Sequence, residues 1–94
     1  MAVRHTERPI DVLDSKHMMG IILFLSENGP SRRVDIYDGI SRNASMPQRF
    51  EALKGCGMIE EFVTYDGPVL GLTESGRKLA GLLRTIEDLI KSNG

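Results

Sequence analysis

The sequence predicts a single, mainly α-helical domain with one small β-hairpin, an α+β fold. Its length of 94 residues is that of one domain. Apolar residues recur at helical spacing in four stretches, and β-favouring residues take their place between Met58 and Leu72. A chain this short buries only about 60 to 65% of the surface that it exposes when unfolded, so a partner subunit would add burial.

The first helix is expected after an N-terminal arm. Residues 1–10 show no sustained periodicity and contain Pro9, so we assign residues 1–14 to an arm that is loose or packs only on a partner. A helix then starts after Asp14 or Ser15, either of which can cap it, and its apolar stripe is Met18, Ile21, Ile22 and Leu25. The run Asn28-Gly29-Pro30 ends this helix, because glycine supplies a left-handed stop and proline forbids continuation.

Two further helices are expected before the hairpin. Ser31 is predicted to cap a helix of about two turns that ends near Gly39, with an inward face drawn from Val34, Ile36 or Tyr37, and Ile40. The next helix is predicted over 46–55, with Ser45 as its cap and Pro47 in its first turn, where a missing N–H costs nothing. Its inward face is Met46, Phe50 and Leu53, which are spaced i, i+4 and i+7.

The β-favouring stretch predicts a hairpin with its turn at Asp66-Gly67. Two strands alone are marginal in water, so the hairpin must lie against the helices. Thr73 is expected to cap a last helix that runs to Lys91. We therefore divide the single domain into a core at 15–76 and a C-terminal dimerisation helix at 77–94.

The predicted elements follow one another as helix, helix, turn, helix, hairpin and helix. This is the order of a helix-turn-helix with a β-wing, whose third helix can enter the major groove of DNA. Three motifs within Ile21–Leu83 carry a resemblance: Ile22–Leu25 followed by Asn28-Gly29-Pro30, Phe50–Leu53 running into Gly57-Met58-Ile59-Glu60, and Leu72-Thr73-Glu74-Ser75-Gly76-Arg77. On these motifs the chain resembles the winged helix-turn-helix transcriptional regulators of the MarR, PadR and HxlR type and their small archaeal relatives. The resemblance implies that Leu72 ends the wing strand, Thr73 caps the next helix and Gly76 allows close packing.

The sequence departs from this pattern in two places. The turn from Gly39 to Met46 is longer than the three to four residues of a strict helix-turn-helix. The wing tip at 64–67 has no Arg or Lys, and Glu60 and Glu61 precede it. If the chain binds DNA, affinity therefore rests on the second and third helices.

Positive charge is concentrated in one block of a chain whose net charge is -1. Residues 32–54 hold five cations against Asp35, Asp38 and Glu51, whereas residues 55–76 hold four acids and no base. Gln48 and Arg49 are expected on the outward face of the 46–55 helix, where they suit adenine and guanine, although an ordinary solvated face has the same pattern. The flanking cations suit contacts with phosphates; they are Arg32, Arg33, Arg42 and Lys54. Two neutral side chains, Asn43 and Ser45, suit further contacts with the DNA backbone.

The last helix has an apolar stripe too wide for one neighbour. We expect Leu79, Leu82 and Ile86 to cover the core while other apolar residues point elsewhere, and we assign the interface of a homodimer to Leu83, Ile86, Leu89 and Ile90. Such pairing suits half-sites about 34 Å apart. The alternative is that residues 11–13 of the same chain fold back over this helix.

Other classes find little support in the sequence. The longest apolar run, Ile21–Leu25, is too short to span a membrane, so we expect a cytoplasmic protein with no membrane partner. Cys56 is the one cysteine, and we expect it to be a small buried residue and not a redox sensor. No metal-ligand spacing, phosphate loop or nucleophile motif is present. We predict no enzyme, no metal site and no cofactor, and the sequence identifies no small-molecule effector.

These observations predict a homodimeric transcriptional regulator that binds double-stranded DNA. The alternative is a winged helix that binds another protein and not DNA, which the acidic wing and the near-neutral charge favour. A continuous positive face would favour DNA, whereas interruption by Asp35, Asp38 and Glu51 would favour a protein partner.

Overall fold

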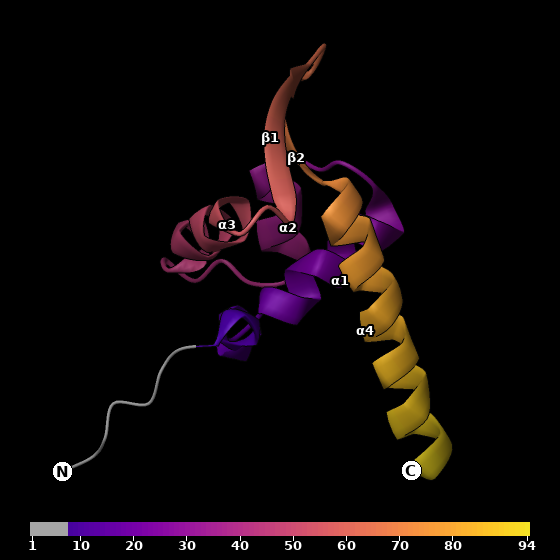
Figure 1. Cartoon of the computed structure of the whole chain (residues 1–94). Coiled ribbons are helices and arrows are strands. Elements are labelled where there is room, and N and C mark those ends of the chain that lie inside the picture. The colour runs from indigo at the N-terminus through magenta and orange to yellow at the C-terminus, as the bar shows by residue number, and fades with distance from the viewer. Residues whose placement is uncertain (1–7) are drawn as a thin grey trace, which may run out of the picture.

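The helices and the hairpin follow one another in the predicted order in the computed structural model, which describes residues 8–94 (Figure 1). The α-helices are α1 (Met18–Asn28), α2 (Arg33–Gly39), α3 (Met46–Gly55) and α4 (Glu74–Asn93). Strands β1 (Ile59–Thr64) and β2 (Gly67–Leu72) form the hairpin, and a 3-10 helix, η1 (Pro9–Asp14), precedes α1. The predicted mainly α-helical fold with one hairpin is confirmed.

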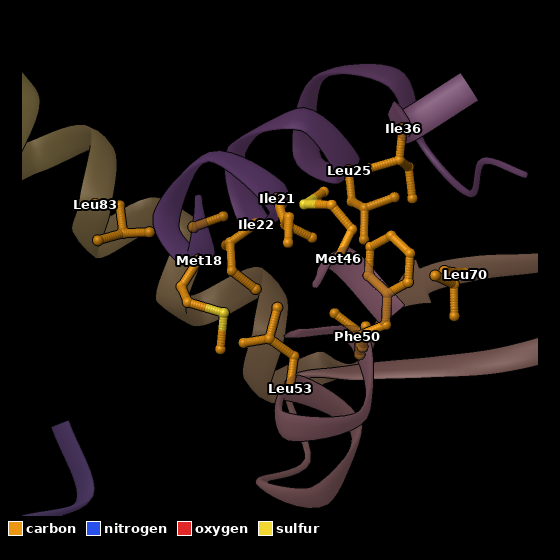
Figure 2. Close-up of a cluster of buried hydrophobic side chains, with 12 residues drawn as sticks. Met18, Ile21, Ile22, Leu25, Ile36, Met46, Phe50, Leu53, Leu70 and Leu83 are labelled. Carbon is orange, nitrogen blue, oxygen red and sulfur yellow. The ribbon is translucent and has the colours of Figure 1, made fainter. Parts of the chain in front are cut away.

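The core lies between α1, α3 and the base of the hairpin (Figure 2). The predicted stripe of α1 and the predicted inward face of α3 are all buried, and they meet Ile36 of α2, Leu70 of β2 and Leu83 of α4. Phe50 is fully buried at the centre, and its ring stacks on that of Tyr37 at a centroid distance of 5.9 Å. Val34, which was expected to face inward, is 42% exposed, so Ile36 is the buried anchor of α2.

The hairpin is tied to the link between α1 and α2. Its strands are antiparallel, with Ile59 opposite Leu72 and Thr64 opposite Gly67. Ser31 pairs with Leu70 through two backbone hydrogen bonds of 2.8 and 2.9 Å, on the edge of β2 away from β1. The prediction that Ser31 caps α2 is therefore wrong: its extended backbone belongs to the sheet, and Arg32 is the N-cap residue.

The segment before α1 also differs from the prediction. Helix α1 begins at Met18, later than expected, because His17 has a left-handed backbone (φ 72°) that separates it from η1. Val12 and Leu13 of η1 pack against the core beside α1. Residues 9–14 are thus part of the folded chain and not a loose arm, while residues 1–7 lie outside the described part.

Helix α4 begins as predicted and then leaves the core. The Thr73 hydroxyl accepts a hydrogen bond from the Gly76 N–H at 3.0 Å, which confirms the cap. Gly76, Ala80 and Leu83 are its buried residues. Leu83, expected at the surface, is only 5% exposed, and Leu82, expected in the core, is 63% exposed. This reversal of Leu82 and Leu83 follows from the rotation of α4 about its axis. Gly76 lies so close to Met58 that the helix face of Gly76, Ala80 and Leu83 must point inward.

The second half of α4 extends away from the rest of the chain (Figure 1). Every residue from Arg84 to Gly94 is exposed. Within residues 8–94, no helix is both long enough and apolar enough to cross a membrane.

Candidate nucleic-acid interface

The outer face of α3 is open to solvent. Met46, Phe50 and Leu53 point into the core as predicted, so the opposite side of the helix carries Gln48 and Ala52, which are both exposed. Together with Ser15 and Met18 at the start of α1, these two residues line an open hollow. Gln48 is therefore available to a ligand, as the spacing predicted.

Arg49 does not share this outward position. Its Nε donates a hydrogen bond of 2.5 Å to the carbonyl oxygen of Lys16, in the link between η1 and α1, and its Nη1 donates to the Ser45 hydroxyl. The prediction that Arg49 lies on the outward face is wrong, because Arg49 is held across the gap between α3 and the start of α1. Arg49 therefore positions α3 against α1.

The long turn before α3 is organised by Asn43. Its Oδ1 accepts hydrogen bonds of 2.8 Å from both the backbone N–H and the hydroxyl of Ser45. The Ser45 hydroxyl is directed to Asn43 and makes no capping bond to the backbone of α3, so the predicted side-chain cap is absent although Ser45 is the N-cap residue. Asn43 and Arg42 are both exposed in this turn, and Arg42 forms an ion pair with Asp38 at the end of α2.

Four charged side chains join α2, α3 and β1. Oε1 of Glu61 lies 3.2 Å from Nη2 of Arg33 and 3.2 Å from Nζ of Lys54. Oε2 of Glu51 lies 3.2 Å from the same Lys54 nitrogen and 3.9 Å from the Arg33 nitrogen. The Arg33 guanidinium also lies over the Phe50 ring, 5.2 Å from its centroid, in a cation–π contact. We call these four residues the α2–α3–wing ion network.

The ionised forms of this network stabilise one another. Hydrogen bonds from Arg33 and then Lys54 lower the pKa of the Glu61 carboxyl. Hydrogen bonds to Glu61 and Glu51 raise the pKa of the Lys54 ammonium. The network joins two cations to two carboxylates, so its formal charges cancel.

Each cation that was expected to bind phosphate has a carboxylate beside it. Arg32 pairs with Asp35 at 3.2 Å, Arg42 pairs with Asp38, and Arg33 and Lys54 belong to the ion network. With Arg49 included, five cations face four carboxylates, so the region has one net positive charge. The positive face is interrupted at Asp35, Asp38 and Glu51, which is the arrangement that favours a protein partner. Sequence reasoning missed Glu61, since no local pattern links a wing residue to Arg33.

The wing presents apolar and acidic groups. Phe62, Val63 and Tyr65 are exposed, and Tyr65 at the turn is fully open to solvent. Glu60, on the same strand as Glu61, is exposed and makes no ion pair with residues 8–94. The wing tip thus offers a DNA backbone no positive charge.

An apolar surface runs along the second half of α4. Ile86, Leu89 and Ile90 are 51 to 67% exposed. Beside them lies a shallow groove of about 160 Å³ between α1 and α4, lined by Met19, Leu23, Leu83, Ile86, Glu87 and Ile90. Leu83 therefore reaches this surface only at the floor of the groove.

No protein-family model and no curated protein sequence matches this chain. Solved structures do match it along almost its whole length. A possible HxlR family transcriptional factor from Thermoplasma volcanium GSS1 is similar with a TM-score of 0.75 and 22% identity, over 98% of this chain and 86% of its own. The transcriptional regulator YodB from B. subtilis, in its reduced form, is similar with a TM-score of 0.71 and 20% identity, over 94% and 90%.

A third match is an archaeal protein, a reported mechanosensitive channel described as a structural homolog of MarR-like transcriptional regulators. It has a TM-score of 0.76 and 16% identity, over 99% of this chain and 88% of its own. The chain has the winged-helix fold. The predicted resemblance to MarR- and HxlR-type proteins is thus confirmed at the level of fold. In this winged helix, α2 and α3 are the helix-turn-helix, β1 and β2 are the wing, and α4 is the helix that follows it.

Proposed function

We propose that this winged-helix chain is a transcriptional regulator that binds double-stranded DNA through α3 and the turn before it. The observation that carries the proposal is the exposed outer face of α3 in a fold whose third helix suits the major groove. The similarity to two proteins described as transcriptional regulators or factors supports it.

The bases are read by neutral side chains in this proposal. Gln48 on α3 and Asn43 in the preceding turn are exposed, and carboxamides pair with adenine in the major groove. Only Oδ1 of Asn43 contacts Ser45. The amide nitrogen of Asn43 takes no part in these contacts, so it is available as a donor. Ala52, one turn after Gln48, suits contact with a thymine methyl group. Arg49 acts as a positioning residue.

Phosphates are bound by the cations around this face. Arg32 and Arg33 lie at the start of α2, Arg42 lies in the turn, and Lys54 lies at the end of α3. Ser45 adds a neutral contact. Phosphate contacts fix the register of a protein on DNA, and their number sets the salt dependence of binding.

We further propose a homodimer whose interface is the second half of α4. Ile86, Leu89 and Ile90 are exposed beside the groove that Leu83 floors, and a second copy would cover them. Replacing Leu89 and Ile90 together by Glu is expected to give a folded monomer, because both side chains are exposed within one chain. A light-scattering mass of two chains for this variant would reject the interface.

A second candidate function is the binding of another protein. The interrupted positive face and the exposed Phe62, Val63 and Tyr65 of the wing favour it. In this alternative the α2–α3–wing ion network is a permanent structural feature.

Titration of a labelled generic duplex separates the two functions. Fluorescence anisotropy is measured at about 50 and 200 mM salt, because phosphate binding loses affinity steeply over this range. Binding that weakens steeply with salt supports the DNA function, and an absence of binding at both salt concentrations supports the protein partner. Once a specific site is found, Gln48→Ala is expected to weaken that site by about 1 to 3 kcal/mol and to leave random duplexes unchanged.

A further inference from the structure

The α2–α3–wing ion network places a wing carboxylate on two of the cations that the proposed function needs. One oxygen of Glu61 accepts from Arg33 and from Lys54, both at 3.2 Å. These two cations come from different helices, and this carboxylate and that of Glu51 each lie within 4 Å of both. Glu51 lies on the outer side of the pair, with 64% of its side chain exposed.

A phosphate oxygen makes the same contacts as a carboxylate oxygen. Arginine and lysine bind both anions through charge-assisted hydrogen bonds. The side chains of Arg33, Lys54 and Glu61 are 33, 30 and 29% exposed, so an anion in solution reaches them without unfolding the core. Ion pairs at this degree of exposure are weak. A DNA backbone, with one charge per phosphate, is therefore able to displace Glu61.

We propose that Glu61 is an internal competitor of DNA phosphate for Arg33 and Lys54, and that it sets the affinity of the interface. This inference rests on the proposed function. Competition by Glu61 explains why the surface is nearly neutral in the free chain. Glu61 holds Arg33 and Lys54 in place, and these two side chains leave Glu61 when phosphate replaces its carboxylate. Glu61 then takes up a cation from solution, which offsets part of the counterion release on binding.

The test compares Glu61→Gln with Glu60→Gln by anisotropy on one generic duplex at about 50 and 200 mM salt. Both substitutions remove one negative charge from β1, but Glu60 makes no ion pair with residues 8–94. Glu61→Gln is expected to bind about three- to tenfold more tightly than wild type at the lower salt, with a salt slope steeper by about one. Glu60→Gln is expected to stay within about twofold of wild type.

Lys54→Gln, made in wild type and in Glu61→Gln, tests the mechanism. If Glu61 occupies Lys54, the loss of Lys54 costs little affinity in wild type and several-fold more in the Glu61→Gln background. Thermal unfolding of each variant verifies that it is folded, and Glu61→Asp, which shortens the side chain and keeps its charge, replaces Glu61→Gln if that variant is unfolded. The shorter carboxylate is expected to give a smaller gain in affinity.

The outcomes separate the inference from the function on which it rests. Salt-sensitive binding by all variants, with equal affinity for Glu61→Gln and Glu60→Gln, overturns the competitor and leaves the DNA function intact. An equal cost of Lys54→Gln in both backgrounds overturns it in the same way. Failure of every folded variant to bind DNA overturns both.

Discussion

Replacing Gly76 by Ala tests the junction that fixes the rotation of α4 and the position of the wing. A Cβ at this residue would lie 2.0 Å from the backbone oxygen of Met58, whereas real Cβ contacts are not closer than 3.0 Å. The backbone must therefore shift by about 1 Å. The same oxygen accepts from the Thr73 N–H at 3.1 Å, so the shift also strains this hydrogen bond.

The expected cost follows from three terms. Overpacking costs about 1 to 3 kcal/mol, and a weakened hydrogen bond costs about 1 kcal/mol. Alanine in a helix returns at most about 1 kcal/mol relative to glycine. We expect Gly76→Ala to lower the free energy of unfolding by about 1 to 3 kcal/mol, which is a fall in Tm of roughly 5 to 20 °C for a chain of this size.

Gly81→Ala is the matched control on the same helix. No atom lies within 4 Å of a Cβ there, so the helix propensity acts alone and stability is expected to rise by about 0.5 to 1 kcal/mol. Both variants are followed by circular dichroism during thermal and urea unfolding, at one protein concentration because a dimer makes Tm depend on concentration. A Gly76→Ala protein as stable as wild type would refute the close approach of α4 to Met58.

Substitutions at three further residues test local contacts. Thr73→Ala removes the cap of α4 and is expected to cost about 1 kcal/mol in urea unfolding, whereas Thr73→Ser keeps the hydroxyl and most of the stability. The pKa of Glu61 is lowered in the folded chain, so its ion pairs stabilise the fold above the ordinary glutamate pKa of about 4.3 and are lost as the pH falls through the lowered value. Glu61→Gln should flatten this acid limb of the stability profile, and an unchanged limb would count against the ion pairs. Arg49→Ala is expected to weaken specific and random duplexes alike, since Arg49 bonds to Lys16; a loss confined to a specific site would give Arg49 a base-reading role.

Local patterns in the sequence predicted the elements with short-range causes. Helix α3 spans 46–55 as expected, because Pro47 and the i, i+4, i+7 spacing of its apolar face fix its start and its orientation. Thr73 caps α4 as the resemblance implied, since its hydroxyl accepts from the N–H of Gly76, only three residues later. These features need no knowledge of distant contacts.

The features that the sequence did not predict depend on contacts between distant residues. Leu83 is buried and Leu82 is exposed, the reverse of the prediction, because of the rotation of α4 about its axis. The packing of Gly76 on Met58 determines this rotation. Ser31 joins the sheet through Leu70, which lies 39 positions later. The pairing of Arg33 with Glu61 spans 28 positions and appears only when the wing folds onto α2 and α3.

The central claim, that DNA binds at α3 and its flanking cations, is tested most directly by mapping the contact on the protein. A generic duplex is added to the ¹⁵N-labelled chain at low salt, and the shifts of the backbone amides are followed by NMR. We expect the changes to gather on residues 42–54 and on Arg32 and Arg33, and to diminish as salt is added. Changes confined to the exposed wing tip or to α4, or no change at all, would contradict the account.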